Sequence, residues 1–512
     1  MKKIIAIISL LLFISCNSLF HEEDNQYMVI DKHQEKVDIV NGMYSLLVKV
    51  HNQDYFQALL RSDDVENYYN YLGNMGGIHV QIDIPAVTGT IYKNLYCLII
   101  NVNSLLPKLS AADDAALKGE LYFLRAYAYF KLARLFGKPP LVTDADVNFL
   151  IEKPSYTQVY ELIEKDMLKA LELLPDNYLK ARIAGETPHK GVAKALLAEV
   201  YLAWAGFPIN DQSKYAEAAR LSGEVIQQAD EYNFGLLDDI ADLWRVRYRH
   251  NQENLFGLFF NPETKNPGTL GIINAGGPDP YILLETSNNI NSGAPQTYFM
   301  PFGVDFPVIS YIPEFKFYSN FPLNYRKKCF YPLTTFTGKS LNPLIDQVSY
   351  LEYMFCYKWH DRDYNSNNKR WGPFTIGSQV TLYLLRYAQT FLTYAEASAR
   401  SGKLDESAYE AVNKIRRRAN KLDIYSPSKF DLPKNLSAEQ FLDAVVWERA
   451  WELSFEPDGR WFDIVRLNLK DKLPEYRFSN DRPSQVSQQY LTEDWYFFKI
   501  PEGDRIINPN FQ

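Results

Sequence analysis

Three glutamates near the C-terminal end of the chain, Glu448, Glu452 and Glu456, follow one another at intervals of four residues. Side chains four residues apart share one face of a helix. Two carboxylates can hydrolyse a glycosidic bond, but only from opposite sides of the bond and with the pKa of one of them raised. Acids on one helix face point the same way, so this spacing argues against a glycoside hydrolase.

Basic residues are interleaved with these acids. Arg449, Arg460 and Arg466 lie in the same stretch, together with Asp463. Guanidinium groups nearby keep carboxylates ionised, whereas a general acid must hold its proton. We therefore interpret this stretch as a structural ion-pair network and expect no catalysis from it.

A second polar group, Asp361, Asp363 and Asn365, follows the DxDxN start of a calcium-binding loop. Ser366 stands where that loop requires glycine, and Gly372 stands where it requires glutamate, which excludes an EF-hand. A loose structural Ca²⁺ site remains an alternative to a plain polar turn. We expect no other cofactor.

Aromatic residues cluster around the same turn, namely Trp359, Tyr364 and Trp371. Such rings combine a flat apolar face with a polar edge, which suits the C–H faces and hydroxyls of sugars. Their polar neighbours argue against burial of all three. We take them as candidate ligand-binding residues; the alternative is that they pack against the scaffold.

Metal and disulfide chemistry find little support. The chain has seven histidines with no HExxH motif, and its four cysteines, Cys16, Cys97, Cys329 and Cys356, form no CxxC pair. A zinc site or a disulfide framework is therefore not expected.

The N-terminus has the pattern of an export signal. Lys2 and Lys3 precede an apolar run from Ile4 to Ile14, and Ser15-Cys16 follows. Eleven residues are too few to span a bilayer, which needs about 20. We predict a lipoprotein signal over residues 1–15, acylation of Cys16 and a flexible tether to residue 36. The alternative is a plain secretory signal cleaved elsewhere.

Composition excludes two further classes. Apolar residues make up 46% of the 512, which provides for a sizeable core and excludes global disorder. The net charge is −8, and loss of Lys2 and Lys3 with the signal makes it −10. Such an acidic chain is not expected to bind nucleic acid, which requires a basic field.

Apolar periodicity predicts helices from residue 37 to about 260 and again after residue 380. Three are rich in alanine, which lets neighbouring helices approach closely, and two of these are followed by a partner helix. The predicted ranges are Gly119–Phe136, Gly191–Ala205, Tyr215–Gln228, Leu384–Ser401 and Leu404–Arg418. A tetratricopeptide repeat has this arrangement: a helix, a glycine turn and a second helix, with alanine where the helices cross.

Residues 261–345 differ from the rest. They contain 11 prolines and 7 glycines, about twice the chain-wide frequency, so long helices are not expected there. We predict one domain over residues 37–512, in which residues 261–380 form an irregular, ligand-binding insert of loops and short strands. The fold class is all-α.

Several blocks together resemble the SusD/RagB family of Bacteroidetes outer-membrane lipoproteins. They run in family order along most of the chain. The blocks are Arg61–Tyr69, Gly119–Leu141, Ala195–Pro208, Leu385–Gly402, Ala411–Ala419, Glu448–Arg466 and Phe498–Gln512.

The resemblance implies four tetratricopeptide-like helix pairs with an irregular insert and no enzymatic activity. It implies a lipid-anchored lid, facing the outside of the cell, on a SusC-like TonB-dependent transporter barrel in the outer membrane. It implies capture of oligosaccharides or, in some members, of peptides. A helical scaffold that binds only proteins is a further alternative.

The family also directs attention to the loop after the Asp63-Asp64 block, where members often build ligand contacts. In this sequence the matching loop carries Tyr68, Tyr69, Tyr71 and Asn74. Tyr281, within the insert, is a third candidate. We expect at least one aromatic residue of these groups to line the ligand site.

Overall fold

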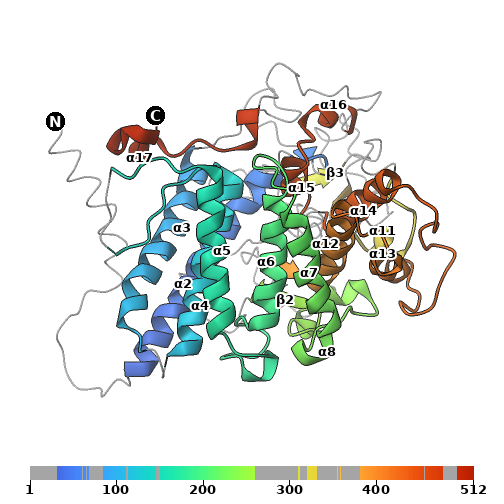
Figure 1. Cartoon of the computed structure of the whole chain (residues 1–512), viewed down its shortest axis with the longest axis horizontal. Coiled ribbons are helices and arrows are strands. Elements are labelled where there is room, and N and C mark those ends of the chain that lie inside the picture. The colour runs from blue at the N-terminus through green and yellow to red at the C-terminus, as the bar shows by residue number, and fades with distance from the viewer. Residues whose placement is uncertain are drawn as a thin grey trace, which may run out of the picture.

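The computed structural model is mainly helical and contains a few short strands (Figure 1). The residues that it describes are 32–59, 62–64, 66–67, 85–110, 114–145, 150–259, 309–311, 320–330, 354–355, 358, 381–454, 456–476 and 493–511.

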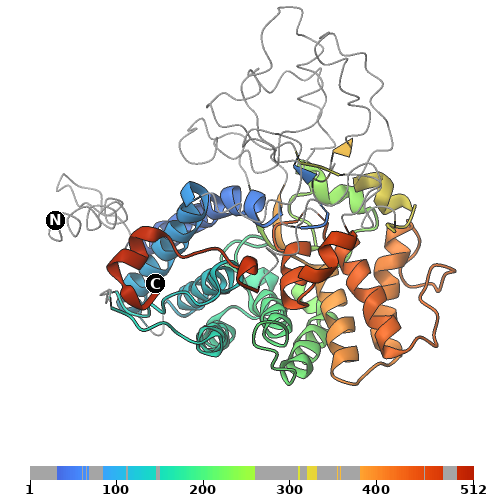
Figure 2. The same ribbon diagram turned by 90° about the horizontal axis from the view of Figure 1, so that it is seen from above.

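Four pairs of helices form the scaffold. Within each pair, two scaffold helices that follow each other in the chain pack together. The pairs are α2 with α3, α4 with α5, α6 with α7, and α12 with α13. Their bounds are Lys32–Leu59, Pro85–Leu105, Ala115–Phe136, Tyr156–Leu173, Lys190–Trp204, Lys214–Gln227, Tyr387–Arg400 and Glu406–Ala419. The pairs also stack on one another, through α3 on α4, α5 on α6 and α7 on α12. Seen from above, they follow each other in chain order along an arc (Figure 2). The predicted all-α, tetratricopeptide-like fold is confirmed.

Local sequence explains where these helices begin and end. The Ser155 hydroxyl accepts a hydrogen bond from the backbone N–H of Gln158 at the start of α5, and the Gln158 side chain accepts one from Ser155 N–H in return. The His189 side chain caps α6. Helix α4 ends at Gly137, whose φ of +75° favours glycine.

Close packing in the scaffold depends on a small residue. A Cβ atom built on Gly119 of α4 would lie 2.8 Å from the backbone nitrogen of Leu174, at the end of α5. A small residue therefore allows the close approach of α4 to the end of α5. Helix α4 is buried on almost all sides, which explains why its apolar stripe is accompanied by buried Tyr127, Tyr129 and Phe130.

Three boundaries differ from the predictions by three residues or more. Helix α4 begins at Ala115, four residues before the predicted start at Gly119. Residues 384–386 belong to strand β5, Leu382–Arg386, so α12 begins only at Tyr387. Buried residues continue from the strand into the helix, and periodicity cannot separate a buried strand from a buried helix. Helix α2 begins at Lys32, inside the segment expected to be a tether.

The strands form two small antiparallel sheets. In one, β2, Asn254–Leu258, pairs with β5. In the other, β3, Ile309–Tyr311, lies between β1, Glu66–Asn67, and β4, Met354–Phe355. The second sheet thus unites strands from three distant parts of the chain.

The remaining helices complete the frame. Helix α11 covers Tyr325–Phe330, α14 covers Ala438–Glu452 and packs on α12, and α15 covers Arg460–Arg466. The short α8, α16 and α17 cover Ala229–Tyr232, Leu473–Tyr476 and Glu502–Ile507. Within the described residues, none of the helices has the length and apolar character needed to cross a bilayer.

Candidate functional site

The stretch with four-residue spacing continues beyond the three glutamates to Arg460. Glu448 and Glu452 share one helix, α14, but the helix ends at Glu452 and the next one begins at Arg460. Glu456 lies between the two helices, so the expectation of a single continuous helix face holds only for the first two acids. All four side chains are nevertheless buried.

Each of the three acids meets cations from other parts of the fold. Glu452 is 2.9 Å from Arg326 of α11, 3.2 Å from Arg386 of β5 and 2.7 Å from Arg418 of α13. Glu448 lies 2.7 Å from the same Arg326 guanidinium. The predicted ion-pair network is confirmed.

Glu456 and Glu253 extend the network. Glu456 lies 2.6 Å from the Lys358 ammonium and 2.7 Å from Arg386. Glu253, just before β2, is 2.6 Å from both Arg386 and Arg418. We call this set the junction cluster: Glu253, Arg326, Lys358, Arg386, Arg418, Glu448, Glu452 and Glu456. Its four acids and four bases balance, which is what buried charges require.

The electrostatics of the junction cluster oppose acid catalysis. Burial alone would raise the pKa of Glu452, but Arg418, Arg386 and Arg326 outweigh that effect and lower its pKa well below the usual range. Burial raises the pKa of Glu456 as well, but the nearby Arg386 and Lys358 outweigh that effect, so the pKa of Glu456 is also lowered. Both carboxylates stay charged, so neither can hold a proton for a leaving group.

The last residue of the series, Arg460, binds the segment before β1. Its Nε and Nη2 atoms donate to the two carboxylate oxygens of Asp63 at 2.7 and 2.8 Å, and both side chains are buried. A bidentate pair of this kind fixes direction as well as distance. Residues 448–460 therefore hold three otherwise separate segments: 62–64, α11 and the position of Lys358.

Strands close in sequence to two of these segments, β1 after residues 62–64 and β4 before Lys358, meet in one sheet with β3. Glu66 of β1 and Phe355 of β4 are both partners of Ser310, on its two sides. Two strand spacings, about 10 Å, separate them. Both strands run antiparallel to β3 and so leave the sheet in the same direction.

The candidate ligand-binding residues lie outside the described residues. These are Tyr68, Tyr69, Tyr71, Asn74, Tyr281, Trp359, Tyr364 and Trp371. The candidate lipidation residue Cys16 and the candidate Ca²⁺ ligands Asp361, Asp363 and Asn365 also lie outside them. Among the residues described, no group of three or more potential metal ligands is found. Cys97 takes part in a disulfide, while Cys329 is a buried thiol.

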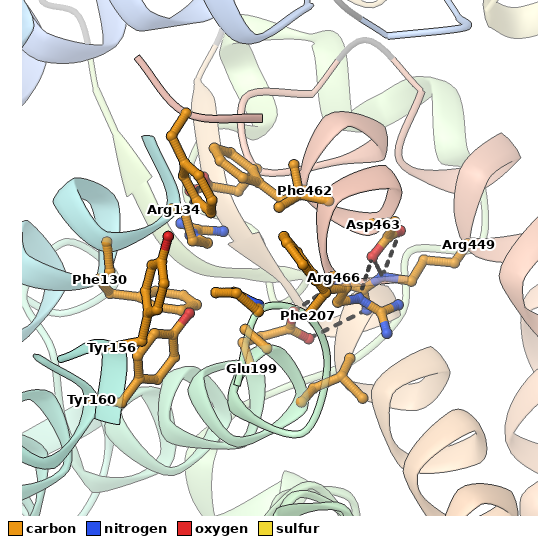
Figure 3. Close-up of a pocket in the computed structure, with 17 residues that line it drawn as sticks. Phe130, Arg134, Tyr156, Tyr160, Glu199, Phe207, Arg449, Phe462, Asp463 and Arg466 are labelled. Atoms are coloured by element: carbon orange, nitrogen blue, oxygen red, sulfur yellow. Dashed lines mark hydrogen bonds and ion pairs between the residues drawn. The ribbon is translucent and has the colours of Figure 1, made fainter. Parts of the chain in front are cut away.

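A cavity lies within the helical scaffold, between α4, α5, α6 and α15 (Figure 3). Arg134 stands in it between two rings, with its guanidinium carbon 3.9 Å from the centroid of Phe130 and 4.1 Å from that of Phe462. The space open to water-sized molecules is about 30 Å³. That volume holds about two waters, whereas small-molecule sites measure about 300–1,000 Å³. The cavity is too small for a sugar.

A second ion-pair network borders this cavity (Figure 3). Arg449 of α14 lies 2.7 Å from Glu199 of α6 and 3.0 Å from Asp463 of α15. Arg466 binds Glu396 of α12 at 2.7 Å and Asp463 at 2.8 Å. We call these five residues the scaffold cluster.

Sequence reasoning found three acids of the junction cluster but missed Glu253 and all four cations. It expected the neighbouring Arg449, Arg460 and Arg466 to balance the acids, but these pair with Glu199, Asp463, Asp63 and Glu396 instead. Arg326, Lys358, Arg386 and Arg418 carry no local pattern that marks them as partners. Long-range folding decides which cations these are.

Fold and site together define a class: a helical-repeat scaffold to which non-helical segments are tied by buried ion pairs. Two family models match the chain. One, described as "Starch-binding associating with outer membrane", matches residues 20–202, and the other, described as the SusD family, matches residues 338–510. The chain belongs to the SusD/RagB family.

Individual relatives agree with this assignment. SusD-like protein P2 of Formosa agariphila is 27% identical over 403 residues, which cover 76% of this chain and 74% of that protein. The crystal structure of a SusD homolog from Bacteroides thetaiotaomicron is 22% identical, with a TM-score of 0.70 over 94% of this chain and 97% of that one. A crystal structure with a xylogluco-oligosaccharide is 19% identical, with a TM-score of 0.67 over 93% and 98% of the two chains. These structures share the fold.

Proposed function

We propose that this protein is a nutrient-binding lipoprotein of the outer membrane that captures glycans at the cell surface. The observation that carries the proposal is the match to two SusD family models over residues 20–202 and 338–510. The description of the first model, starch binding in association with the outer membrane, supports both the ligand class and the location. The structural neighbour solved with a xylogluco-oligosaccharide supports the ligand class as well.

In this proposal the protein is the lid of a SusC-like TonB-dependent transporter. Acylated Cys16 anchors it in the outer membrane, with the body facing the outside of the cell. The protein binds oligosaccharide and passes it to the barrel without cleaving it. The lowered pKa values of Glu452 and Glu456 support the absence of hydrolysis.

In this proposal the ligand binds to aromatic side chains of the insert and of the segment after Asp63. The positions of the described residues that immediately precede these candidates support the placement. Tyr68 follows directly on Asn67 of β1, and Trp359 follows directly on Lys358 of the junction cluster. Because the sheet and the buried ion pairs hold both starting points on the scaffold, loops that begin there have a fixed base for recognition.

Calorimetric titration of the chain from Asn17 onward against a panel of glycans and oligopeptides tests the proposal. We expect binding of at least one glycan at micromolar or weaker affinity, and no released product when the mixture is analysed by chromatography. Hydrolysis would move the protein to the enzymes. Binding of oligopeptides alone would make it a peptide-binding lid of the same transporter type. Capture of a large barrel protein with no small ligand would favour a protein-binding scaffold.

A further inference from the structure

The loop that joins α13 to α14 displays apolar side chains on the surface. The structure leaves ten large apolar side chains exposed among the residues it describes, and three of them fall within nine residues of this loop. They are Leu422, 41% exposed, Tyr425, 75% exposed, and Phe430, 37% exposed. Exposed aromatic residues gathered in one loop are typical of a binding surface.

The same region also carries two lysines beside exposed rings. Residues 414–434 contain seven lysines and arginines, of which Arg416, Arg417, Arg418, Lys421 and Lys434 form ion pairs with acids. Lys414 and Lys429 are the other two. The ammonium of Lys414 lies 5.1 Å from the centroid of the Tyr425 ring, and that of Lys429 lies 5.2 Å from the centroid of Phe430. Within the part of the chain that the structure describes, neither lysine forms an ion pair. Each of these two positive charges lies beside an exposed aromatic ring.

The loop is held rigidly in this form. Arg417 of α13 pairs with Asp431 at 2.5 Å and with Glu410 at 2.7 Å, and it also donates to the carbonyl oxygen of Ile424 at 2.8 Å. The backbone N–H of Leu432 donates to Asn413 at 2.8 Å. A loop fixed at several points loses little entropy on binding, which favours recognition of a ligand on its surface.

We propose that this surface, defined by Lys414, Leu422, Tyr425, Lys429 and Phe430, binds an anionic polysaccharide. The open Tyr425 ring offers a stacking platform for a sugar ring, and the two ammonium groups attract the carboxylates of uronic acid units. A bilayer fits less well, because membrane contact needs apolar side chains buried about 5–10 Å deep. Here the most exposed side chain, Tyr425, ends in a polar hydroxyl.

This surface is formed by α13 and the loop that follows it, and none of its five defining residues belongs to the junction cluster or to the candidate ligand-binding residues. It would hold an acidic polymer near the protein whatever the proposed nutrient site takes up. The inference therefore goes beyond the proposed function, and its test does not require the nutrient to be known.

Affinity electrophoresis of the full-length protein in neutral detergent provides the test. Polygalacturonate is cast in one gel and fully methyl-esterified polygalacturonate, which has the same backbone without charge, in another. We expect retardation by the acidic polymer alone, weakened as salt rises from 0.05 to 0.5 M because the Debye length falls from about 14 to about 4 Å. The double variant Lys414→Gln/Lys429→Gln should bind about fivefold to tenfold more weakly.

The matched control is Lys169→Gln/Lys180→Gln, which makes the same change in net charge at two exposed lysines on the α5 side. It should bind like the wild type, whereas Tyr425→Ala should weaken binding severalfold without changing the salt dependence. The proposal is overturned if the wild type is not retarded by polygalacturonate, if the esterified polymer retards it equally, or if both double variants lose binding alike. Equal, lysine-dependent binding to anionic phospholipid vesicles would also overturn it, since the surface would then be a membrane contact.

Discussion

The junction cluster and the scaffold cluster are both buried ion networks, yet they join different kinds of structure. The scaffold cluster links α6, α12, α14 and α15, which already pack through apolar faces. The junction cluster instead draws in α11 and Lys358, from segments with little regular structure among the described residues. Apolar contacts tolerate sliding, whereas a balanced set of charges is satisfied in only one arrangement. The comparison suggests that charge fixes the position of parts that helical periodicity cannot align.

The largest expected effect comes from removing one buried carboxylate from each network. Glu452→Gln removes a carboxylate that contacts all three of Arg326, Arg386 and Arg418, and breaking a buried network in this way costs about 3–5 kcal/mol of the free energy of unfolding. Glu396→Gln, which removes one of the two carboxylates that bind Arg466, should cost a similar amount. Thermal unfolding followed by circular dichroism measures both.

The two variants should differ in where the structure loosens. Hydrogen exchange should accelerate in Glu66–Asn67, Ile309–Tyr311 and Met354–Phe355 for Glu452→Gln, and in α12 and α15 for Glu396→Gln. If both variants accelerate the same amides, the junction cluster has no separate positioning role. The exposed Glu439 of α14 gives a control, because Glu439→Gln should change neither stability nor exchange.

The same contrast explains how much of the molecule the sequence could predict. The helix predicted at Gly191–Ala205 was found to within one residue at each end, because burial against neighbours leaves an apolar pattern. Three acids of the junction cluster were found because their spacing is local. Their partners Arg326, Arg386 and Arg418 come from α11, β5 and α13, and no local pattern joins them to Glu452. The error at Leu384–Arg386 has the same origin, since pairing of β5 with β2 is a long-range contact.

A smaller effect on stability is expected from protonation of His189, which caps scaffold helix α6. The His189 ring nitrogen Nδ1 accepts a hydrogen bond from the backbone N–H of Gly191 at 3.2 Å, and the ring lies near Tyr232 and Phe234. Burial lowers the pKa of His189 to about 4. Because the folded pKa lies below the unfolded value of about 6.5, the stabilisation is complete above pH 6.5 and is lost as the pH falls towards 4. The loss should reach about 3 kcal/mol.

Thermal unfolding between pH 7.5 and 4 measures this loss, and His189→Asn isolates it. Asparagine is a good N-cap and does not titrate, so the variant should have a flatter stability profile through this range than the wild type. Identical profiles for the two proteins would mean that the pKa of His189 is the same in the folded and unfolded states. The junction cluster should contribute little here, because the pKa values of Glu452 and Glu456 are lowered.

The smallest effect concerns the close packing between scaffold helices, which does not depend on charge. Gly119→Ala would place a Cβ atom 2.8 Å from the Leu174 nitrogen and 3.0 Å from the Leu173 carbonyl carbon, both of them backbone atoms that cannot turn aside. Helix α4 would have to move away from the end of α5, at a cost of about 1–3 kcal/mol. Gly42 of α2 is the matched control, since nothing lies within 4 Å of its Cβ position, and Gly42→Ala should stabilise the protein by up to about 1 kcal/mol through helix propensity. Denaturant titration of the two variants should therefore give shifts of opposite sign. Shifts of the same sign would mean that helix propensity, and not the close approach of α4 to α5, determines what a glycine contributes to this scaffold.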